Sequence, residues 1–179
     1  MNLWHDISRG DNVPEEINVI VETPRNSPNK YEIDKDSGLI RLDRANYSAA
    51  PFPFEYGFVP QTLWEDNDPV DVVILTTYPL AVGVLVEVRP VAVMEMIDTG
   101  ESDWKIIGVP VHDKRFEDIQ DLDDVHGHQL KEIQHFFETY KELKDGKKGI
   151  VEVPGFHGRD KALEAINKSI NLYQEKFAK

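Results

Sequence analysis

The sequence feature that most constrains the fold is an acidic segment, residues 65–71 (EDNDPVD), followed at once by the apolar run VVIL at 72–75. Pro69 fixes the backbone between the acids, so the carboxylates lie on a stiff turn that leads into a strand. Neighbouring carboxylates repel one another, and repulsion with burial raises their pKa values unless cations compensate. Oxygen ligands of this kind are what Mg2+, Mn2+ and Ca2+ prefer, so the segment is either a metal site or a solvated acidic turn. An EF-hand loop does not fit, because Val70 and Asp71 would occupy its fifth position and its glycine position.

The composition excludes several classes of function. The chain has 179 residues, of which 40% are hydrophobic and 30% charged, so we expect residues 1–179 to form a single soluble domain. A net charge of −13 argues against a nucleic-acid partner, because phosphate backbones are bound by basic surfaces. The sequence has no cysteine, which excludes disulfides, thiolate zinc sites and cysteine nucleophiles. Without a signal-like N-terminus or an apolar run long enough to span a bilayer, we expect a cytoplasmic protein with no membrane partner.

Alternating and β-branched segments predict that the first part of the chain is mainly β. Strands are expected at 17–22, 30–34, 39–42, 72–75, 82–96 and 105–110. Residues 36–38 (DSG) predict a hairpin turn, and Pro90 predicts a bulge or a sheet edge inside the long strand. Residues 46–60 alternate aromatic rings with prolines, which favours a rigid irregular segment rather than a strand in a sheet. Within that segment, the hydroxyl of Tyr56 is the candidate for facing an oxyanion.

A second acidic loop, residues 97–105 (IDTGESDWK), lies between two of the expected strands. Two loops that each carry aspartates at a strand end can converge on one mouth of a barrel, which favours a metal site over a solvated turn. Apolar residues at helical spacing over 130–143 predict a helix, and Asp160 can cap a final helix whose apolar face extends to Phe177. The six histidines are scattered, and we assign no site to them.

The segment DNDPVDV at 66–72 resembles the D-x-D-P-x-D-x signature of the family I soluble inorganic pyrophosphatases, of the prokaryotic type. Other pieces resemble the same family in the same order: NLWHDI at 2–7, KYE at 30–32, DR at 43–44, YG at 56–57, DTGESDWK at 98–105 and HFFETYK at 135–141. The resemblance covers almost the whole chain. It implies an α+β, mainly β fold, a five-stranded OB-type β-barrel flanked by two C-terminal helices, with the site at one barrel mouth. It also implies a homohexamer.

The resemblance further implies the roles of individual residues. The implied metal ligands are Asp66, Asp71, Asp98, Asp103 and Glu32. The side chains implied to hold phosphate oxygens are Lys30, Arg44, Tyr56, Lys105, Tyr140 and Lys141. Asp68 would take the proton of the attacking water, and Glu22 would contribute to metal coordination more weakly. The implied cofactor is Mg2+, several ions per site, with Mn2+ or Zn2+ as substitutes and Ca2+ as an inhibitor.

Two positions depart from the family pattern. Phe52 stands where many members have a tyrosine, so a hydroxyl role is absent there. Thr99 stands where an acid often follows the matching aspartate, which weakens the assignment of the metal that arrives with substrate.

The implied chemistry accounts for the mixture of acids and bases. Pyrophosphate is a multiply charged anion, so metals and cationic side chains must neutralise it before a water can attack. Two alternatives are another metal-dependent phosphohydrolase, and a non-catalytic OB-fold module that would need exposed aromatics and a basic groove. Without a functional role, Lys30, Glu32 and Arg44 would form a surface ion-pair ladder of little energetic value.

Overall fold

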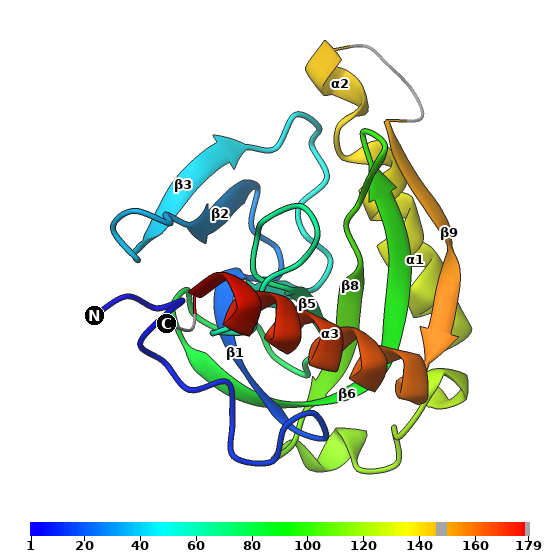
Figure 1. Ribbon diagram of the computed structural model, residues 1–179. Helices are drawn as coiled ribbons and strands as arrows, with labels where there is room; N and C mark the ends of the chain where they lie inside the picture. Colours follow the sequence, from blue (N-terminus) through cyan, green and yellow to red (C-terminus); the bar gives the residue numbers. More distant parts are fainter. Residues whose placement is uncertain (146–149, 178–179) are drawn as a thin grey trace.

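The computed structural model describes residues 1–145 and 150–177, and its centre is a closed ring of five strands (Figure 1). The ring follows the order β1 (Ile17–Thr23), β4 (Glu55–Phe58), β5 (Asp71–Ile74), β8 (Lys105–Pro110) and β6 (Leu85–Asp98). Strand β6 closes the ring by pairing back with β1. This confirms the predicted five-stranded barrel in a mainly β fold.

One pairing in the ring is parallel and brings the two acidic segments together. Strands β5 and β8 run side by side in the same direction, with Asp71 opposite Lys105, whereas the other pairings are antiparallel. Parallel strands begin at the same edge of a sheet. Residues 65–71 lead into β5 and residues 97–105 lead into β8, so both acidic segments lie at the same mouth, as predicted.

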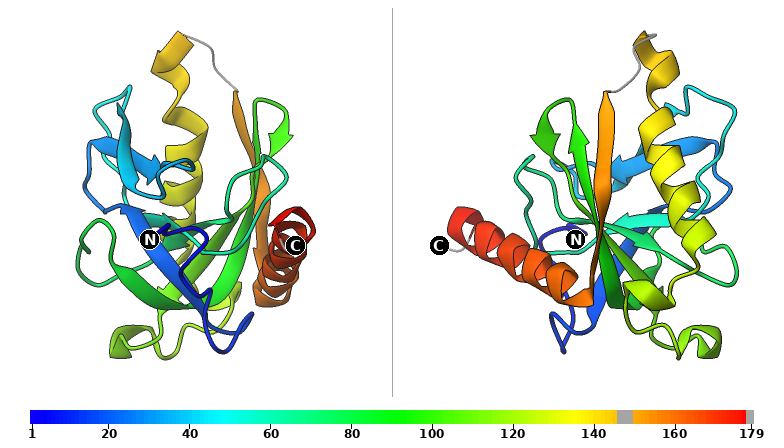
Figure 2. Two further views of the ribbon diagram at one scale, coloured as in Figure 1. Left: turned by 60° about the vertical axis from the view of Figure 1, so that its left-hand side comes forward. Right: turned by 90° about the vertical axis from the view of Figure 1, so that its right-hand side faces the viewer.

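The remaining elements surround this ring. Strands β2 (Asn29–Ile33) and β3 (Ile40–Ala45) form a separate hairpin, while β7 (Glu101–Ser102) and β9 (Val151–Gly158) pair with β6. The helices are α1 (Gly127–Thr139), α2 (Glu142–Asp145) and α3 (Arg159–Phe177), with short 3-10 turns η1 (Lys114–Phe116) and η2 (Leu122–Asp124). Figure 2 shows α1 and α3 on opposite sides of the β6 and β9 strands. Among the described residues, no helix is both long and apolar enough to cross a membrane.

The central strands are buried on both faces, which explains why they read as continuous apolar runs. On β5, Val72 and Ile74 pack in the cluster that includes Ile166 of α3. The residues that follow them in the sequence, Val73 and Leu75, point to the opposite face. There they pack in a second large cluster, which includes the aromatic residues of α1. A strand covered on both sides has no polar face, so its sequence does not alternate.

The structure corrects the expectation for residues 46–60. We predicted an irregular segment, but its end forms β4, which pairs with β1 and β5 inside the ring. The prolines precede the strand, and Gly57 allows a close approach: a Cβ there would lie 2.1 Å from the carbonyl oxygen of Ile20. A lesser correction concerns α3, which begins at Arg159, so Asp160 lies in its first turn instead of capping it. The bulge predicted at Pro90 is present in the pairing of β6 with β8.

Candidate active site

The mouth of the ring holds a polar cavity of about 300 Å³ between the two acidic segments, β4 and the end of α1. Its lining residues are Lys30, Tyr56, Asp66, Asp68, Asp71, Asp98, Thr99, Glu101, Asp103, Lys105, Tyr140 and Lys141. The site residues predicted from the sequence are therefore in its wall, except Arg44, Glu32 and the weaker candidate Glu22, which lines the smaller cavity described next. Glu32 lines a smaller adjoining cavity of about 150 Å³ that shares Lys30, Tyr56, Asp68 and Asp71 with the first.

Lys105 is the buried centre of the acidic group. Its Nζ donates a hydrogen bond to Oδ2 of Asp71 at 2.5 Å and another to Oδ1 of Asp103, and the lysine is 2% exposed. Burial on its own lowers the pKa of Lys105, but the charges of Asp103 and Asp71 outweigh burial and raise the pKa above its usual value. Lys105 is therefore a permanent cation between two carboxylates.

Tyr56 also contacts Asp71, to which its hydroxyl donates a hydrogen bond of 2.5 Å. Burial, followed by the neighbouring charge of Asp71, raises the pKa of Tyr56 well above its usual value. The phenol therefore stays protonated, and a protonated phenol can donate to a carboxylate or to a phosphate oxygen. Tyr56 lines the polar cavity, so its predicted role of facing an oxyanion remains a proposal.

The carboxylates fit a divalent cation by their chemistry. Burial, and after it the charges of Asp103 and Asp71, raises the pKa of Asp66 from 3.8 to about 7, although the backbone N–H of Asp68 donates to Asp66 at 3.0 Å. Burial likewise raises the pKa of Asp71, against the opposing effect of Lys105. Burial and mutual repulsion make the ionised form of these acids unfavourable. A divalent cation bound by their oxygens would offset this cost, and the rigid strand ends hold the oxygens close together.

The contacts of Lys105 also affect how these carboxylates can bind a metal. Among residues 1–145 and 150–177, no three acidic or histidine side chains are already arranged around one point as a closed metal site. Asp71 and Asp103 instead share the ammonium of Lys105. A cation bound by these two carboxylates therefore competes with Lys105 for their oxygens.

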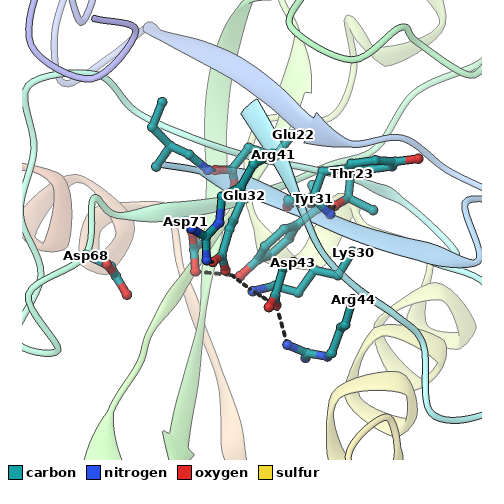
Figure 3. A network of polar contacts seen from close by, with 12 residues as sticks. Glu22, Thr23, Lys30, Tyr31, Glu32, Arg41, Asp43, Arg44, Asp68 and Asp71 are labelled. Atoms are coloured by element: carbon teal, nitrogen blue, oxygen red, sulfur yellow. Dashed lines mark hydrogen bonds and ion pairs between the residues drawn. The ribbon is translucent and has the colours of Figure 1, made fainter. Parts of the chain in front are cut away.

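A second group of charges lies on the β2–β3 hairpin (Figure 3). Lys30 contacts Glu32 at 3.0 Å and Asp43 at 3.3 Å, and Asp43 also pairs with Arg44. Burial on its own lowers the pKa of Lys30, but the charge of Glu32, the hydrogen bond to Glu32 and the influence of Tyr140 together outweigh burial and raise the pKa. These contacts hold cationic groups on the hairpin side of the cavity.

The two departures from the family pattern have clear structural consequences. Phe52 is buried and its ring centroid lies 4.7 Å from that of Phe136, so this position serves the core. Thr99 lines the cavity and its hydroxyl donates to Asp98 at 2.9 Å, while Lys141 pairs with the other oxygen of Asp98. Asp98 is therefore held by a hydroxyl and an ammonium in this structure.

Sequence reasoning gave no role to three residues of the site. Lys35, at the turn of the β2–β3 hairpin, pairs with Asp68 and lines the smaller cavity. Asp43 bridges Lys30 and Arg44, and Glu101 adds another acid to the cavity wall. A charged residue in a turn is usually solvated, so nothing in the sequence indicated that Lys35 belongs to the site.

A closed β ring holds clustered carboxylates at its mouth together with lysines and tyrosines. This arrangement is typical of metal-dependent enzymes that act on phosphate groups. Comparison with known proteins is more specific. The sequence profile of the inorganic pyrophosphatases matches residues 19–174. The chain is 46% identical over 178 residues to the inorganic pyrophosphatase of Haloferax volcanii, covering 99% of both chains. It is 48% identical over 165 residues to that of Thermus thermophilus, covering 92% of this chain and 94% of the relative.

Solved structures agree with this assignment. The crystal structure of the Thermus thermophilus inorganic pyrophosphatase superposes with a TM-score of 0.91 at 47% identity, covering 97% of this chain and 99% of that one. An inorganic pyrophosphatase from Neisseria gonorrhoeae gives a TM-score of 0.87 at 36% identity, with 94% and 97% covered. The chain belongs to the inorganic pyrophosphatase family. Membership in this family implies a divalent metal cofactor.

Proposed function

We propose that this enzyme hydrolyses pyrophosphate to two phosphates with several Mg2+ ions held at the mouth of the ring. The observation that carries the proposal is the grouping of Asp66, Asp71 and Asp103 in one cavity wall with Lys30 and Lys141. Acids alone would repel pyrophosphate, and bases alone would bind it without activating water. Both kinds of group in one cavity of about 300 Å³ suit an anion that arrives with metals.

We infer the metal ligands to be Asp66, Asp71, Asp98 and Asp103, with Glu32 in a weaker or outer position. Bound Mg2+ supplies positive charge, which lowers the pKa of water and neutralises the phosphate oxygens. Mn2+ and Zn2+ are proposed substitutes. Ca2+ is proposed to occupy the site but to inhibit, because it is larger and accepts less regular geometry.

The chain's own residues then bind the substrate and manage one proton. Lys30, Arg44, Tyr56, Lys105, Tyr140 and Lys141 are proposed to hold the phosphate oxygens. Asp68 accepts a proton as the oxygen of water bonds to one phosphorus, and the bond from that phosphorus to the bridging oxygen breaks. The second phosphate leaves with the electron pair of the broken bond, so no protein nucleophile is required.

The finer properties of the protein are proposals as well. We propose that residues 1–179 form one pyrophosphatase domain, that the protein is cytoplasmic and that it assembles as a homohexamer. The hexamer rests on family membership alone. Sedimentation at micromolar concentration tests it, and a monomer or dimer there would contradict it.

Phosphate release tests the proposed function. The assay compares pyrophosphate with ATP and a phosphomonoester in parallel, each with Mg2+ and with a chelator. We expect rapid release from pyrophosphate that requires Mg2+. Preference for ATP would favour the alternative, a different metal-dependent phosphohydrolase. Circular dichroism in the chelator separates loss of metal from loss of fold.

A further inference from the structure

Arg44 lies between two tyrosine rings in a position that sequence reasoning did not anticipate. Its guanidinium carbon is 5.3 Å from the ring centroid of Tyr47 and 5.7 Å from that of Tyr140. Tyr140 lines the main cavity, whereas Arg44 does not. We propose that Tyr47 is a positioning residue that holds the Arg44 guanidinium in place for a phosphate group of the substrate.

The hydrogen bonds of Arg44 show that the guanidinium has a donor to spare. Its Nη1 donates to Asp43, which also accepts from Lys30. Its Nη2 is buried and has no hydrogen-bond partner within residues 1–145 and 150–177. A buried donor without an acceptor is unfavourable in a folded protein, and a phosphate oxygen is an acceptor that a guanidinium fits well. The free protein thus holds an arginine whose hydrogen bonding an arriving anion would complete.

Tyr47 contributes to this arrangement through its ring. The residue lies two positions after the end of β3 and is 37% exposed. The contact that the structure gives for its ring is the one with Arg44, whose guanidinium carbon lies 5.3 Å from the ring centroid. The Arg44 guanidinium is accordingly its principal partner, and the attraction of a cation for a ring face needs no hydroxyl.

This inference rests on the proposed function, and steady-state kinetics with pyrophosphate and Mg2+ test it. For Tyr47→Ala we expect the KM for pyrophosphate to rise about two- to fivefold, the effect of losing one partly exposed cation–π contact. The value of kcat should change by less than the KM, because the ring does not touch the reacting atoms. Tyr47→Phe keeps the ring and should restore the KM, whereas Tyr47→Leu keeps only apolar cover and should behave like Tyr47→Ala.

A double-mutant cycle shows whether Tyr47 acts through Arg44. In an Arg44→Gln background, Tyr47→Ala should have no further effect on the KM or on competitive inhibition by inorganic phosphate. The control is Tyr78→Ala. Tyr78 is also exposed, and the guanidinium carbon of Arg115 lies 5.6 Å from the centroid of its ring, but Tyr78 lines a different cavity. That variant should leave the KM unchanged.

Three results would overturn the inference: equal effects of Tyr47→Ala with and without Arg44, a Tyr47→Leu variant that behaves like Tyr47→Phe, or an unchanged KM in Tyr47→Ala. Thermal unfolding of each variant shows whether a kinetic change comes from partial unfolding. If the unaltered protein did not hydrolyse pyrophosphate, the proposed function itself would fail. That outcome is seen before any variant is measured.

Discussion

Lys105 and Asp71 are partners in register at the start of two parallel strands, and Nζ of Lys105 lies 2.5 Å from Oδ2 of Asp71. The pair results directly from the topology, because parallel strands begin at the same edge of the sheet. The two acidic segments therefore meet where β5 and β8 begin. The same relationship places a buried cation among the acids before any metal is bound.

Lys105→Met should destabilise the metal-free protein because it leaves two neighbouring carboxylates without their cation. Removing one partner from a buried ion pair typically costs about 3–5 kcal/mol, and we expect the free energy of unfolding to fall by roughly the lower figure. Mg2+ should restore more stability to this variant than to the unaltered protein, since Lys105 no longer competes for the oxygens. Urea denaturation with chelator and with Mg2+ measures both effects.

The matched control for this experiment is Lys161→Met. Lys161 pairs with Glu164 on the exposed surface of α3, so its loss should cost well under about 1 kcal/mol. If the two variants were equally stable without metal, Lys105 would not be compensating the acids.

Asp66→Asn should change the pH dependence of stability in the metal-free protein. The pKa of Asp66 is raised in the folded state from 3.8 to about 7. The folded protein therefore holds this proton more tightly than the unfolded chain does, and the resulting contribution to the free energy of unfolding is fully present below pH 4 and is lost as the pH rises through 7. The asparagine variant carries no such penalty. Its stability relative to the unaltered protein should therefore increase between pH 5 and pH 8.

Chemical denaturation of both proteins in chelator, at pH 5 and at pH 8, measures this difference. Saturating Mg2+ should reverse the order at pH 8, because only the carboxylate gains from the cation. A stability difference that is the same at both pH values would show that burial does not perturb Asp66 in this way.

Gly57→Ala should destabilise the ring itself. A Cβ at this position would lie 2.1 Å from the carbonyl oxygen of Ile20, so β1 and β4 would have to separate. Overpacking of this kind costs about 1–3 kcal/mol, and the adjacent Tyr56 would be displaced from the site as well. Gly155→Ala is the control in β9, since a Cβ there meets no atom within 4 Å. Thermal unfolding should show a lower Tm for Gly57→Ala alone; equal values would contradict the steric argument.

The acidic part of the cavity wall could be anticipated because its residues occur in two short acidic segments, each of which leads into a strand; the roles of the other site residues were implied only by the resemblance to a family. Segments 65–71 and 97–105 have local signatures, namely adjacent acids, a proline or glycine and an apolar run. Their meeting at one mouth could also be predicted, because strand ends in a barrel converge. The closed ring of five strands was implied by the resemblance to a family.

Other features depend on contacts between distant residues and had no local signal. Strand β4 was missed because the prolines before it dominate the pattern, whereas its ladder depends on β1 and β5. The position of Lys105 between two acids depends on its register with Asp71, which is a tertiary property. Arg44 lies outside the cavity wall because Asp43 and two tyrosine rings hold it, and the order of residues does not encode that packing.

The most direct test of the account is the rate of pyrophosphate hydrolysis against Mg2+ concentration for Asp68→Asn and Asp66→Asn. Asp66 is proposed to bind the ion, so Asp66→Asn should need more Mg2+ and regain much of its rate in excess metal. Asp68 is proposed to accept the proton, so Asp68→Asn should stay about 10²–10⁴-fold slower at every Mg2+ concentration. Higher pH should partly restore Asp68→Asn, because solvent hydroxide replaces the base. Full recovery of Asp68→Asn in excess Mg2+, with no response to pH, would contradict the account and make Asp68 a metal ligand.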